Sequence, residues 1–248
     1  MKKRLTRFLP FLLAFTIALP SYSVFAEEEN QAKETQTNET NETQADETTA
    51  NDTLSLAAET AVLIDAASGE ILYDKDADKK MYPASITKLM TILLALENGK
   101  LTDEITFSHD AVYNIEPGSA HIAILEGETL TLEQVLRAII LRSANEASNG
   151  VAEYVDGSVE AFAKHMTERA KELGCTNTNF VNANGLFDEN HYTTAHDMAL
   201  IARELLKHEE YRSMMSETDY EIPPTNLQTE TRYLHGQHQM LNPNSIYY

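Results

Sequence analysis

The sequence predicts an α+β fold: a β-hairpin, then a block of helices, then a few further strands. Residues 60–65 and 70–73 are short β-rich runs joined by Ala66-Ala67-Ser68-Gly69, which predicts a hairpin with glycine where a positive φ is needed. Between residues 83 and 207, apolar residues recur at helical spacing and capping residues mark the ends. Strands and helices do not alternate along the chain, which argues against a parallel βαβ architecture.

The first 53 residues are expected to lie outside this fold. Residues 1–26 combine a basic start, an apolar run from Phe8 to Leu19 and the small-residue cleavage site Val24-Phe25-Ala26, a pattern typical of a secretory signal peptide. Residues 27–53 are acidic, rich in Thr and Asn, and nearly free of large apolar residues, so we expect a disordered linker. The folded domain is therefore assigned to residues 54–248, and the mature protein is predicted to be secreted beyond the cytoplasmic membrane.

Composition limits the classes of partner. A formal net charge of −20 over 248 residues argues against binding to nucleic acid or anionic lipid through a basic patch. The single cysteine, Cys175, excludes an internal disulfide bond and reads as a small buried hydrophobe. An apolar content of 42% is sufficient for a folded core.

The helical block is predicted in detail. Helices are expected over residues 83–97, 131–141, from 143 or 144 to 157, 158–173, and 194 to about 207. Residues 101–130 are expected to be irregular, 177–191 to form an Asn-rich loop around Gly185, and 220–248 to hold strand-like fragments.

The helix over 83–97 carries the first candidate chemistry. Ser85 and Lys88 are three residues apart, so they share one face of a helix that is apolar on nearly every other side. A serine hydroxyl becomes a nucleophile when a base accepts its proton, and a lysine can serve if desolvation keeps it neutral. The pattern is loose, and taken alone it fits a buried serine beside a snorkelling lysine better than a catalytic pair.

A second motif adds weight to the first. Arg142-Ser143-Ala144-Asn145-Glu146 lies at the predicted junction of two helices, where Ser143 and Asn145 can face a cleft. Ser143 could pass a proton between Lys88 and a leaving amine, and Asn145 could hold both the lysine and a substrate amide. Alternatively, Ser143 is a plain N-cap.

These motifs together resemble the serine D-Ala-D-Ala carboxypeptidases, the low-molecular-mass penicillin-binding proteins of peptidase family S11. The resemblance rests on residues 83–91 and 141–148, on 180–186 and 193–199, and on the hairpin, and it covers nearly all of 55–248. It implies a β-lactamase/transpeptidase-like fold, with a helical subdomain on a mainly antiparallel sheet. It places the nucleophile on Ser85, the general base on Lys88, and the Ser-x-Asn pair on Ser143 and Asn145, with Ser85 and Asn145 also binding substrate.

The resemblance also implies function and location. The family trims the terminal D-alanine from peptidoglycan stem peptides through an acyl-serine, in the bacterial cell envelope, where it takes part in cell-wall synthesis and cell shape. β-Lactams trap the same serine covalently. No cofactor and no metal are implied, and no membrane anchor is encoded among these residues.

One departure from the family concerns its third motif. Lys-Thr-Gly, which lines the cleft on a sheet strand, does not occur in this chain, and residues 241–248 resemble the sequence just upstream of it. We therefore expect a chain that stops before this motif, with an incomplete sheet and one oxyanion donor, the backbone N–H of Ser85. Such a chain is expected to show little or no turnover, which hydrolysis of a D-Ala-D-Ala peptide would refute.

Three rival functions remain open at this point. A class A-like β-lactamase shares the Ser-x-x-Lys chemistry but needs a Glu-x-x-Asn downstream, which is absent in the right region. A metallopeptidase could use His235 and His238, or His191 and His196, although no His-Glu-x-x-His occurs. An inactive peptidoglycan-binding fragment is the third.

Overall fold

The computed structural model describes residues 56–246, so the predicted signal peptide and linker lie outside the described residues. The described part contains helices, two short 3₁₀ turns and paired strands. The helices are α1 (Lys88–Asn98), α2 (His109–Tyr113), α3 (Leu132–Arg142), α4 (Asn145–Asp156), α5 (Val159–Glu172), α6 (Ala195–Leu205) and α7 (Glu209–Met215). The strands are β1 (Ala61–Ile64), β2 (Ile71–Lys75), β3 (Glu104–Thr106), β4 (Thr129–Thr131), β5 (Asp219–Ile222) and β6 (Arg232–His235), and the 3₁₀ turns are η2 (Ala84–Thr87) and η3 (Gln239–Leu241).

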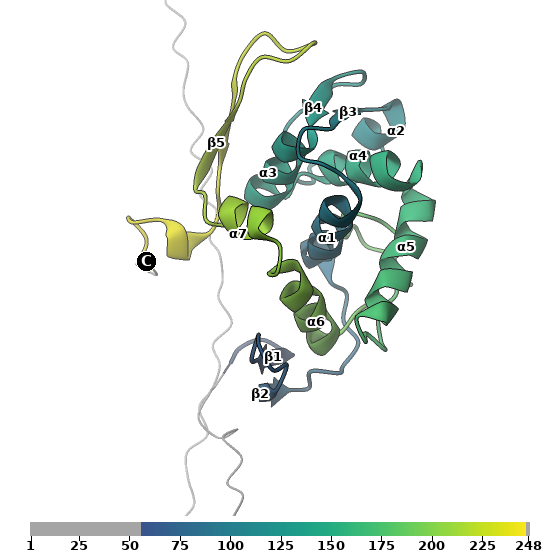
Figure 1. Ribbon diagram of the computed structural model, residues 1–248, viewed down its shortest axis with the longest axis vertical. Helices are drawn as coiled ribbons and strands as arrows, with labels where there is room; N and C mark the ends of the chain where they lie inside the picture. The colour runs from purple at the N-terminus through teal and green to yellow at the C-terminus, as the bar shows by residue number, and fades with distance from the viewer. Residues whose placement is uncertain (1–55, 247–248) are drawn as a thin grey trace, which may run out of the picture. The chain divides into compact units, whose positions relative to one another are not determined.

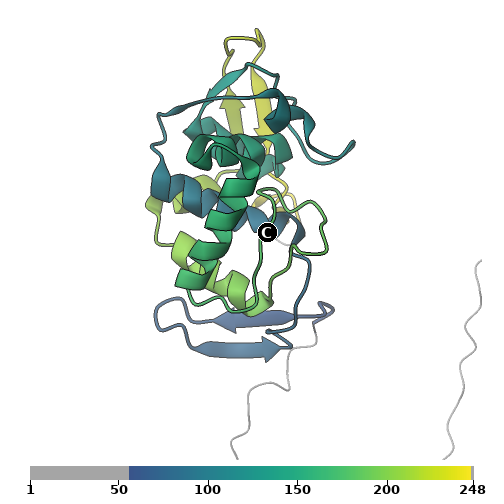
Figure 2. The ribbon, with the colours of Figure 1, turned by 90° about the vertical axis from the view of Figure 1, so that its right-hand side faces the viewer.

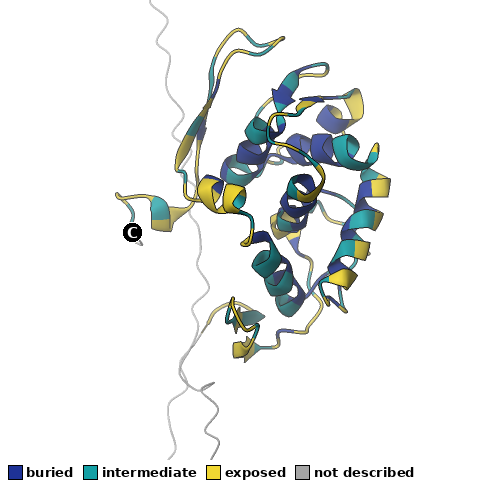
Figure 3. Ribbon diagram, in the orientation of Figure 1, coloured by how far each residue is buried: buried dark blue, intermediate teal, exposed yellow. Residues whose placement is uncertain are grey.

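Helix α1 is the centre of the core. Figure 1 shows it enclosed by α3, α4, α5 and α6, and Figure 3 shows it among the most buried elements. Its sequence explains this position, because the consecutive residues 90–95 are all buried and a run of this length covers every face of a helix. The helix begins where the 3₁₀ turn η2 ends, so its first residue is Lys88.

Capping residues fix the ends of the surrounding helices as predicted. Thr131 caps α3 in a reciprocal capping box with Gln134, and Ser158 and Thr194 cap α5 and α6 by accepting backbone N–H groups. Gly157 ends α4 in the left-handed region at φ +77°. The predicted helices over 131–141, 143–157, 158–173 and 194–207 are confirmed to within a few residues.

The strands form three separate antiparallel pairs among the described residues. The predicted hairpin is β1–β2, turned by Gly69 at φ +83°. The others are β3–β4 and β5–β6. Figure 2 places β1–β2 at one end of the helical block and β5–β6 at the other.

Two parts of the prediction were wrong. Residues 101–130 are not wholly irregular, since they contain β3, α2 and β4, and α7 was missed altogether. These elements have three, five, three and seven residues, too short for periodicity to show.

Two ion-pair clusters attach the β5–β6 region to the helical block. Arg232 donates two hydrogen bonds of 2.7 Å to the buried Glu128 carboxylate. Burial raises the pKa of Glu128, but hydrogen bonds from Arg232, the Leu125 N–H and Thr225 together hold it below its usual value. Arg137 of α3 reaches Glu217 in the same bidentate way, at 2.7 and 2.9 Å.

No helix among residues 56–246 is both long and apolar enough to cross a membrane.

Candidate active site

Ser85 lies on an exposed turn just before the central helix. The turn η2 starts after Pro83, and Ala84 has φ +48°, an unfavourable left-handed conformation for a residue with a Cβ. In a 3₁₀ turn, residues three apart are nearly eclipsed, so the side chains of Ser85 and Lys88 point the same way. The sequence predicted one continuous helix from Pro83; the structure divides it into η2 and α1.

The Lys88 ammonium nitrogen is buried and has three partners. Its side chain is 3% exposed, and Nζ donates to Ser85 Oγ at 3.1 Å, Asn145 Oδ1 at 2.8 Å and the Asn184 main-chain oxygen at 2.6 Å. Burial lowers the pKa of Lys88 to about 8, although nearby Glu146 acts in the opposite direction.

The chemistry of these partners tells which one can give Lys88 a proton. The Asn145 and Asn184 oxygens can only accept, so a neutral amine spends its two N–H donors on them. Its lone pair is then left for Ser85 Oγ, the one partner with a proton to give. The arrangement therefore poises neutral Lys88 to deprotonate Ser85.

Ser143 and Asn145 complete the cluster at the junction of α3 and α4. Ser143 sits in the left-handed region at φ +55°, and its Oγ donates to Ser85 Oγ at 3.0 Å. The alternative reading of Ser143 as an N-cap was wrong, because the N-cap of α4 is Ala144. Asn145 is buried, and its backbone N–H donates to the Ala120 oxygen at 2.9 Å. All four predicted site residues are thus brought together.

The loop at residues 182–191 contributes contacts that the sequence did not reveal. Besides the Asn184 carbonyl, the Asn184 amide donates to Asn149 Oδ1 of α4 at 3.0 Å. A main-chain carbonyl carries no side-chain identity, so no sequence pattern could have selected Asn184 for this contact. The one sequence feature that pointed to this loop was Gly185, directly after Asn184.

Gly185 packs directly against the Ser85 turn. It has φ +83°, and a Cβ added there would lie 1.9 Å from the Ala84 carbonyl oxygen and 2.5 Å from its carbon. Only glycine permits both the conformation and the approach. The position of the Ser85 turn therefore depends on a loop 100 residues later in the chain.

His191 holds the same loop to η2. Its Nδ1 accepts the Val181 N–H at 3.1 Å, which leaves the ring proton on Nε2, and Nε2 donates to Thr87 Oγ1 at 2.8 Å. The side chain is 2% exposed, and burial lowers the pKa of His191 to about 4 against the opposing charge of Asp188. A neutral histidine thus holds Thr87, the residue directly before Lys88, in place.

A largely apolar cavity of about 500 Å³ opens beside the cluster. Ser85, Lys88 and Ser143 lie on its wall, together with apolar side chains of α1, α3 and α7 and residues 236–241. The apolar side chains are Ile86, Leu89, Ile92, Ile139, Ile140, Leu141, Tyr211, Met215 and Leu241.

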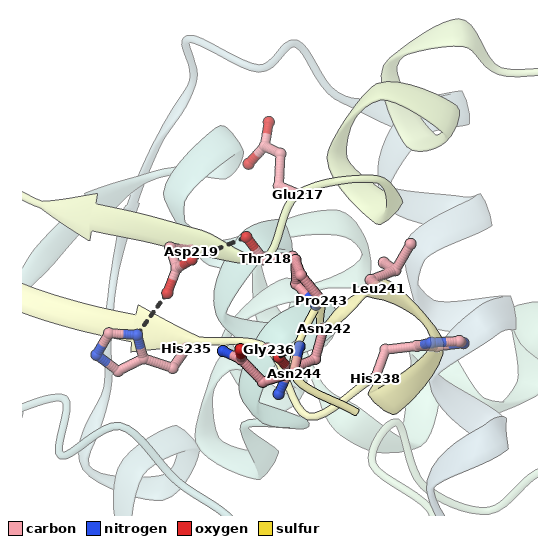
Figure 4. Close-up of a pocket in the computed structure, with 10 residues that line it drawn as sticks. All are labelled: Glu217, Thr218, Asp219, His235, Gly236, His238, Leu241, Asn242, Pro243 and Asn244. Carbon is pink, nitrogen blue, oxygen red and sulfur yellow. Dashed lines mark hydrogen bonds and ion pairs between the residues drawn. The ribbon is translucent and has the colours of Figure 1, made fainter. Parts of the chain in front are cut away.

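A second cavity of about 370 Å³ lies along the start of β5 and the end of β6. Figure 4 shows its lining, with Thr218 bonded to Asp219 and Asp219 to His235. It shares Glu217, Gly236, His238 and Leu241 with the first cavity but contains none of the four clustered residues. Ser85, Lys88 and Ser143 therefore face the first cavity and not the second.

The candidate metal ligands are dispersed. Within residues 56–246, no group of three or more His, Cys, Asp or Glu side chains could hold a metal ion. His191 binds Thr87, His196 approaches Asp78 at 3.4 Å, and His235 pairs with Asp219. Cys175 is buried as predicted, and burial raises the pKa of its thiol to about 12.

Comparison with known proteins now adds to this geometry. The family model of the D-alanyl-D-alanine carboxypeptidases, peptidase family S11, matches residues 44–246. The chain belongs to this family. The resemblance found in the sequence is thereby confirmed.

The carboxypeptidase family also supplies close relatives and solved structures. The chain is 43% identical over 161 residues to D-alanyl-D-alanine carboxypeptidase DacF of Bacillus subtilis, covering 63% of this chain and 41% of the relative. It is similar to the crystal structure of DacD from Francisella tularensis (31% identity, TM-score 0.62, covering 67% and 41%). It is also similar to penicillin-binding protein 5 from Haemophilus influenzae (28% identity, TM-score 0.67, covering 76% and 54%).

These carboxypeptidase structures confirm the predicted α+β, transpeptidase-like fold. The chain spans about 41% of the length of DacF and DacD.

Proposed function

We propose that this protein is a serine-type D-Ala-D-Ala carboxypeptidase that removes the terminal D-alanine from peptidoglycan stem peptides. The observation that carries the proposal is the hydrogen bond between the buried Lys88 Nζ and Ser85 Oγ, with the other two Lys88 partners being obligate acceptors. Membership of the family supplies the substrate class.

Acylation follows from this arrangement. Lys88 Nζ takes the Ser85 hydroxyl proton as Oγ bonds to the carbonyl carbon of the penultimate D-alanine. The negative charge on the carbonyl oxygen is stabilised by the backbone N–H of Ser85. As the C–N bond breaks, the Lys88 ammonium gives up the proton that it took from Ser85, and Ser143 Oγ, which lies 3.0 Å from Ser85 Oγ, passes a proton to the leaving D-alanine amine.

Deacylation repeats the steps with water. Lys88, neutral again, accepts a proton from a water molecule that attacks the Ser85 ester, and Ser85 Oγ leaves with a proton returned by Lys88. Asn145 holds Lys88 and offers its amide N–H₂ to the substrate.

The same proposal covers partners and location. β-Lactams are expected to acylate Ser85, because their strained amide presents a carbonyl to the same nucleophile. The leader-like residues 1–26 and the linker-like residues 27–53 support export to the cell envelope, where residues 54–248 act in cell-wall synthesis and cell shape.

The experiment is labelling with a fluorescent penicillin, followed by peptide mapping. We expect stoichiometric labelling at Ser85, none in Ser85→Ala, and normal labelling in Ser213→Ala, which removes an exposed serine of α7. D-alanine release from a D-Ala-D-Ala pentapeptide measures turnover in parallel. An unlabelled, folded wild type would overturn the proposal.

The same protein distinguishes the rivals. Rapid nitrocefin hydrolysis would favour a class A-like β-lactamase, whereas a stable acyl-enzyme supports the carboxypeptidase. Loss of activity with a chelator would favour the metallopeptidase. A folded protein whose Ser85 is not labelled by the fluorescent penicillin would favour the inactive peptidoglycan-binding fragment.

A further inference from the structure

We propose that Tyr82 and Phe187, called the aromatic pair below, form a subsite for the side chain of the residue that precedes D-Ala-D-Ala in the substrate. The subsite prefers a long, unbranched aliphatic side chain. This inference deepens the proposed function and rests on it, because that function supplies the peptide substrate. The aromatic pair determines specificity and takes no part in the bond-breaking steps.

The two rings are exposed and contact each other. Tyr82 is 58% and Phe187 71% exposed, and their ring centroids lie 4.9 Å apart at an interplanar angle of 70°, an edge-to-face arrangement. Single exposed apolar residues are common on protein surfaces, whereas two large rings in contact form a continuous apolar surface. Because an edge-to-face contact covers only one face of one ring, the other ring faces remain free for a ligand.

The aromatic pair comes from the two segments that build the Ser85 turn. Tyr82 precedes Ser85 by three residues, and three residues span at most about 11 Å. Phe187 follows Gly185 by two residues, and Gly185 packs directly against the Ala84 carbonyl group. The pair is therefore held close to the proposed nucleophile from both sides of this contact.

Hydrogen bonds fix the backbone on both sides of the aromatic pair. Directly before the first ring, the backbones of Met81 and Thr193 exchange two hydrogen bonds, of 2.8 and 3.0 Å. Before the second ring, the Asn182 side chain accepts the Gly185 N–H at 2.7 Å and donates to the Leu186 carbonyl at 2.9 Å. The surface is thus formed before a ligand arrives, so that binding requires little ordering of the backbone.

The aromatic pair lies outside the first cavity, where the acyl part of the substrate continues. That cavity has a volume of about 500 Å³, and a peptide attached to a polymer must extend beyond it over an exposed surface. Ser85 is itself exposed, and its exposed neighbour Ile86 lines the cavity. Neither Tyr82 nor Phe187 lines it. The pair therefore offers an exposed apolar surface beside Ser85 that the cavity does not include.

Peptide geometry identifies the substrate residue that can reach this surface. The Cα atom of the residue preceding D-Ala-D-Ala lies roughly 5 Å from the carbonyl carbon that Ser85 attacks, and an extended four-carbon side chain reaches roughly 5 Å further. Such a chain can pack its methylene groups against the ring faces, whereas glycine at this position has nothing to reach them with. We therefore expect the length of this side chain to determine how tightly a peptide binds.

The test compares the binding of acetyl-norleucyl-D-Ala-D-Ala and acetyl-glycyl-D-Ala-D-Ala to the full chain carrying Ser85→Ala, by isothermal titration calorimetry. This variant cannot be acylated, so the measurement reports binding alone. Partial burial of the four-carbon chain is expected to make the norleucyl peptide bind about tenfold more tightly than the glycyl peptide. Adding Tyr82→Ala or Phe187→Ala should remove most of this preference and leave the affinity for the glycyl peptide unchanged.

Two further variants make the result specific. Tyr82→Phe keeps the ring and should retain the preference for the norleucyl peptide. Tyr113→Ala removes a ring of α2 that is also 58% exposed and contacts the His109 ring at 4.7 Å between centroids. It should leave the affinities for both peptides unchanged. Circular dichroism confirms the folding of each variant.

The outcomes separate the subsite from the proposed function. Equal affinities for the two peptides, or a preference that persists without either ring, overturn the subsite. An equal loss of affinity for both peptides in Tyr82→Ala also overturns it, because the ring would then only support the Ser85 turn. If neither peptide binds, the subsite is again overturned, and fluorescent-penicillin labelling of the wild type decides separately whether the carboxypeptidase proposal stands.

Discussion

Replacing Gly185 with alanine tests whether the loop at residues 182–191 positions the Ser85 turn. Two costs add. A left-handed conformation costs an alanine about 1–2 kcal/mol, and Gly185 has φ +83°. The new Cβ would also lie 1.9 Å from the Ala84 oxygen, a backbone atom that no rotamer change can move away.

The free-energy cost of the clash with Ala84 is similar in size to the cost of the left-handed conformation. Overpacking of this kind costs about 1–3 kcal/mol, so the total loss of unfolding free energy is about 3 kcal/mol. For a domain of this size, that corresponds to a fall in Tm of roughly 6–12 °C. Relief of the clash must move Ala84, so Ser85 leaves its place beside Lys88 and penicillin acylation slows by about a hundredfold or more.

The matched control is Gly157→Ala. Gly157 has nearly the same conformation, φ +77°, but no atom lies within 4 Å of its added Cβ. Gly157→Ala should therefore lose only the conformational term, about 1–2 kcal/mol of unfolding free energy. Its rate of acylation by penicillin should equal that of the wild type. Chemical unfolding and stopped-flow acylation measure both variants. If Gly185→Ala is no less stable than Gly157→Ala and acylates normally, our account of the loop is wrong.

Three other predictions follow from the same geometry. Since burial lowers the pKa of Lys88 to about 8 and only the neutral amine accepts a proton, the wild-type acylation rate should rise with pH around a midpoint near 8; a rate independent of pH between 6 and 9 would contradict this. The folded-state pKa of His191, about 4, lies below its ordinary 6.5, so its contribution to stability is present above 6.5 and is lost as pH falls toward 4. As the pH falls from 6.5 to 4, the difference in unfolding free energy between the wild type and His191→Gln should therefore shrink by up to about 3 kcal/mol. A difference that stays constant over this pH range would contradict the prediction. Finally, Arg232→Ala leaves the buried Glu128 unpaired and should cost about 3–5 kcal/mol in urea unfolding, whereas Arg232→Ala combined with Glu128→Leu should recover part of the loss.

Much of this protein could be predicted from its sequence because local signals agree with the final structure. Thr131, Ser158 and Thr194 begin helices, and Gly157 ends one, as their chemistry requires. The cluster of Ser85, Lys88, Ser143 and Asn145 was accessible because each residue acts through a side chain within a recognisable motif.

The remaining features depend on long-range packing and could not be predicted. The contact from Lys88 to Asn184 uses a main-chain oxygen, and the role of Gly185 depends on how closely Ala84 approaches it. His191 was considered as a metal ligand, whereas its environment makes it a neutral brace for Thr87. Short elements such as β3 and α7 are defined by the partners they pack against rather than by their own pattern.

The bonds from Lys88 to Asn184 and from Thr87 to His191 span 96 and 104 positions of the chain. During synthesis, Ser85, the proposed nucleophile, therefore emerges long before the segment that contacts Lys88 and Thr87, and we expect it to stay unreactive until that segment docks. Covalent capture by penicillin should accordingly report the final step of maturation, and a time course of such capture would mark when the late loop reaches its place.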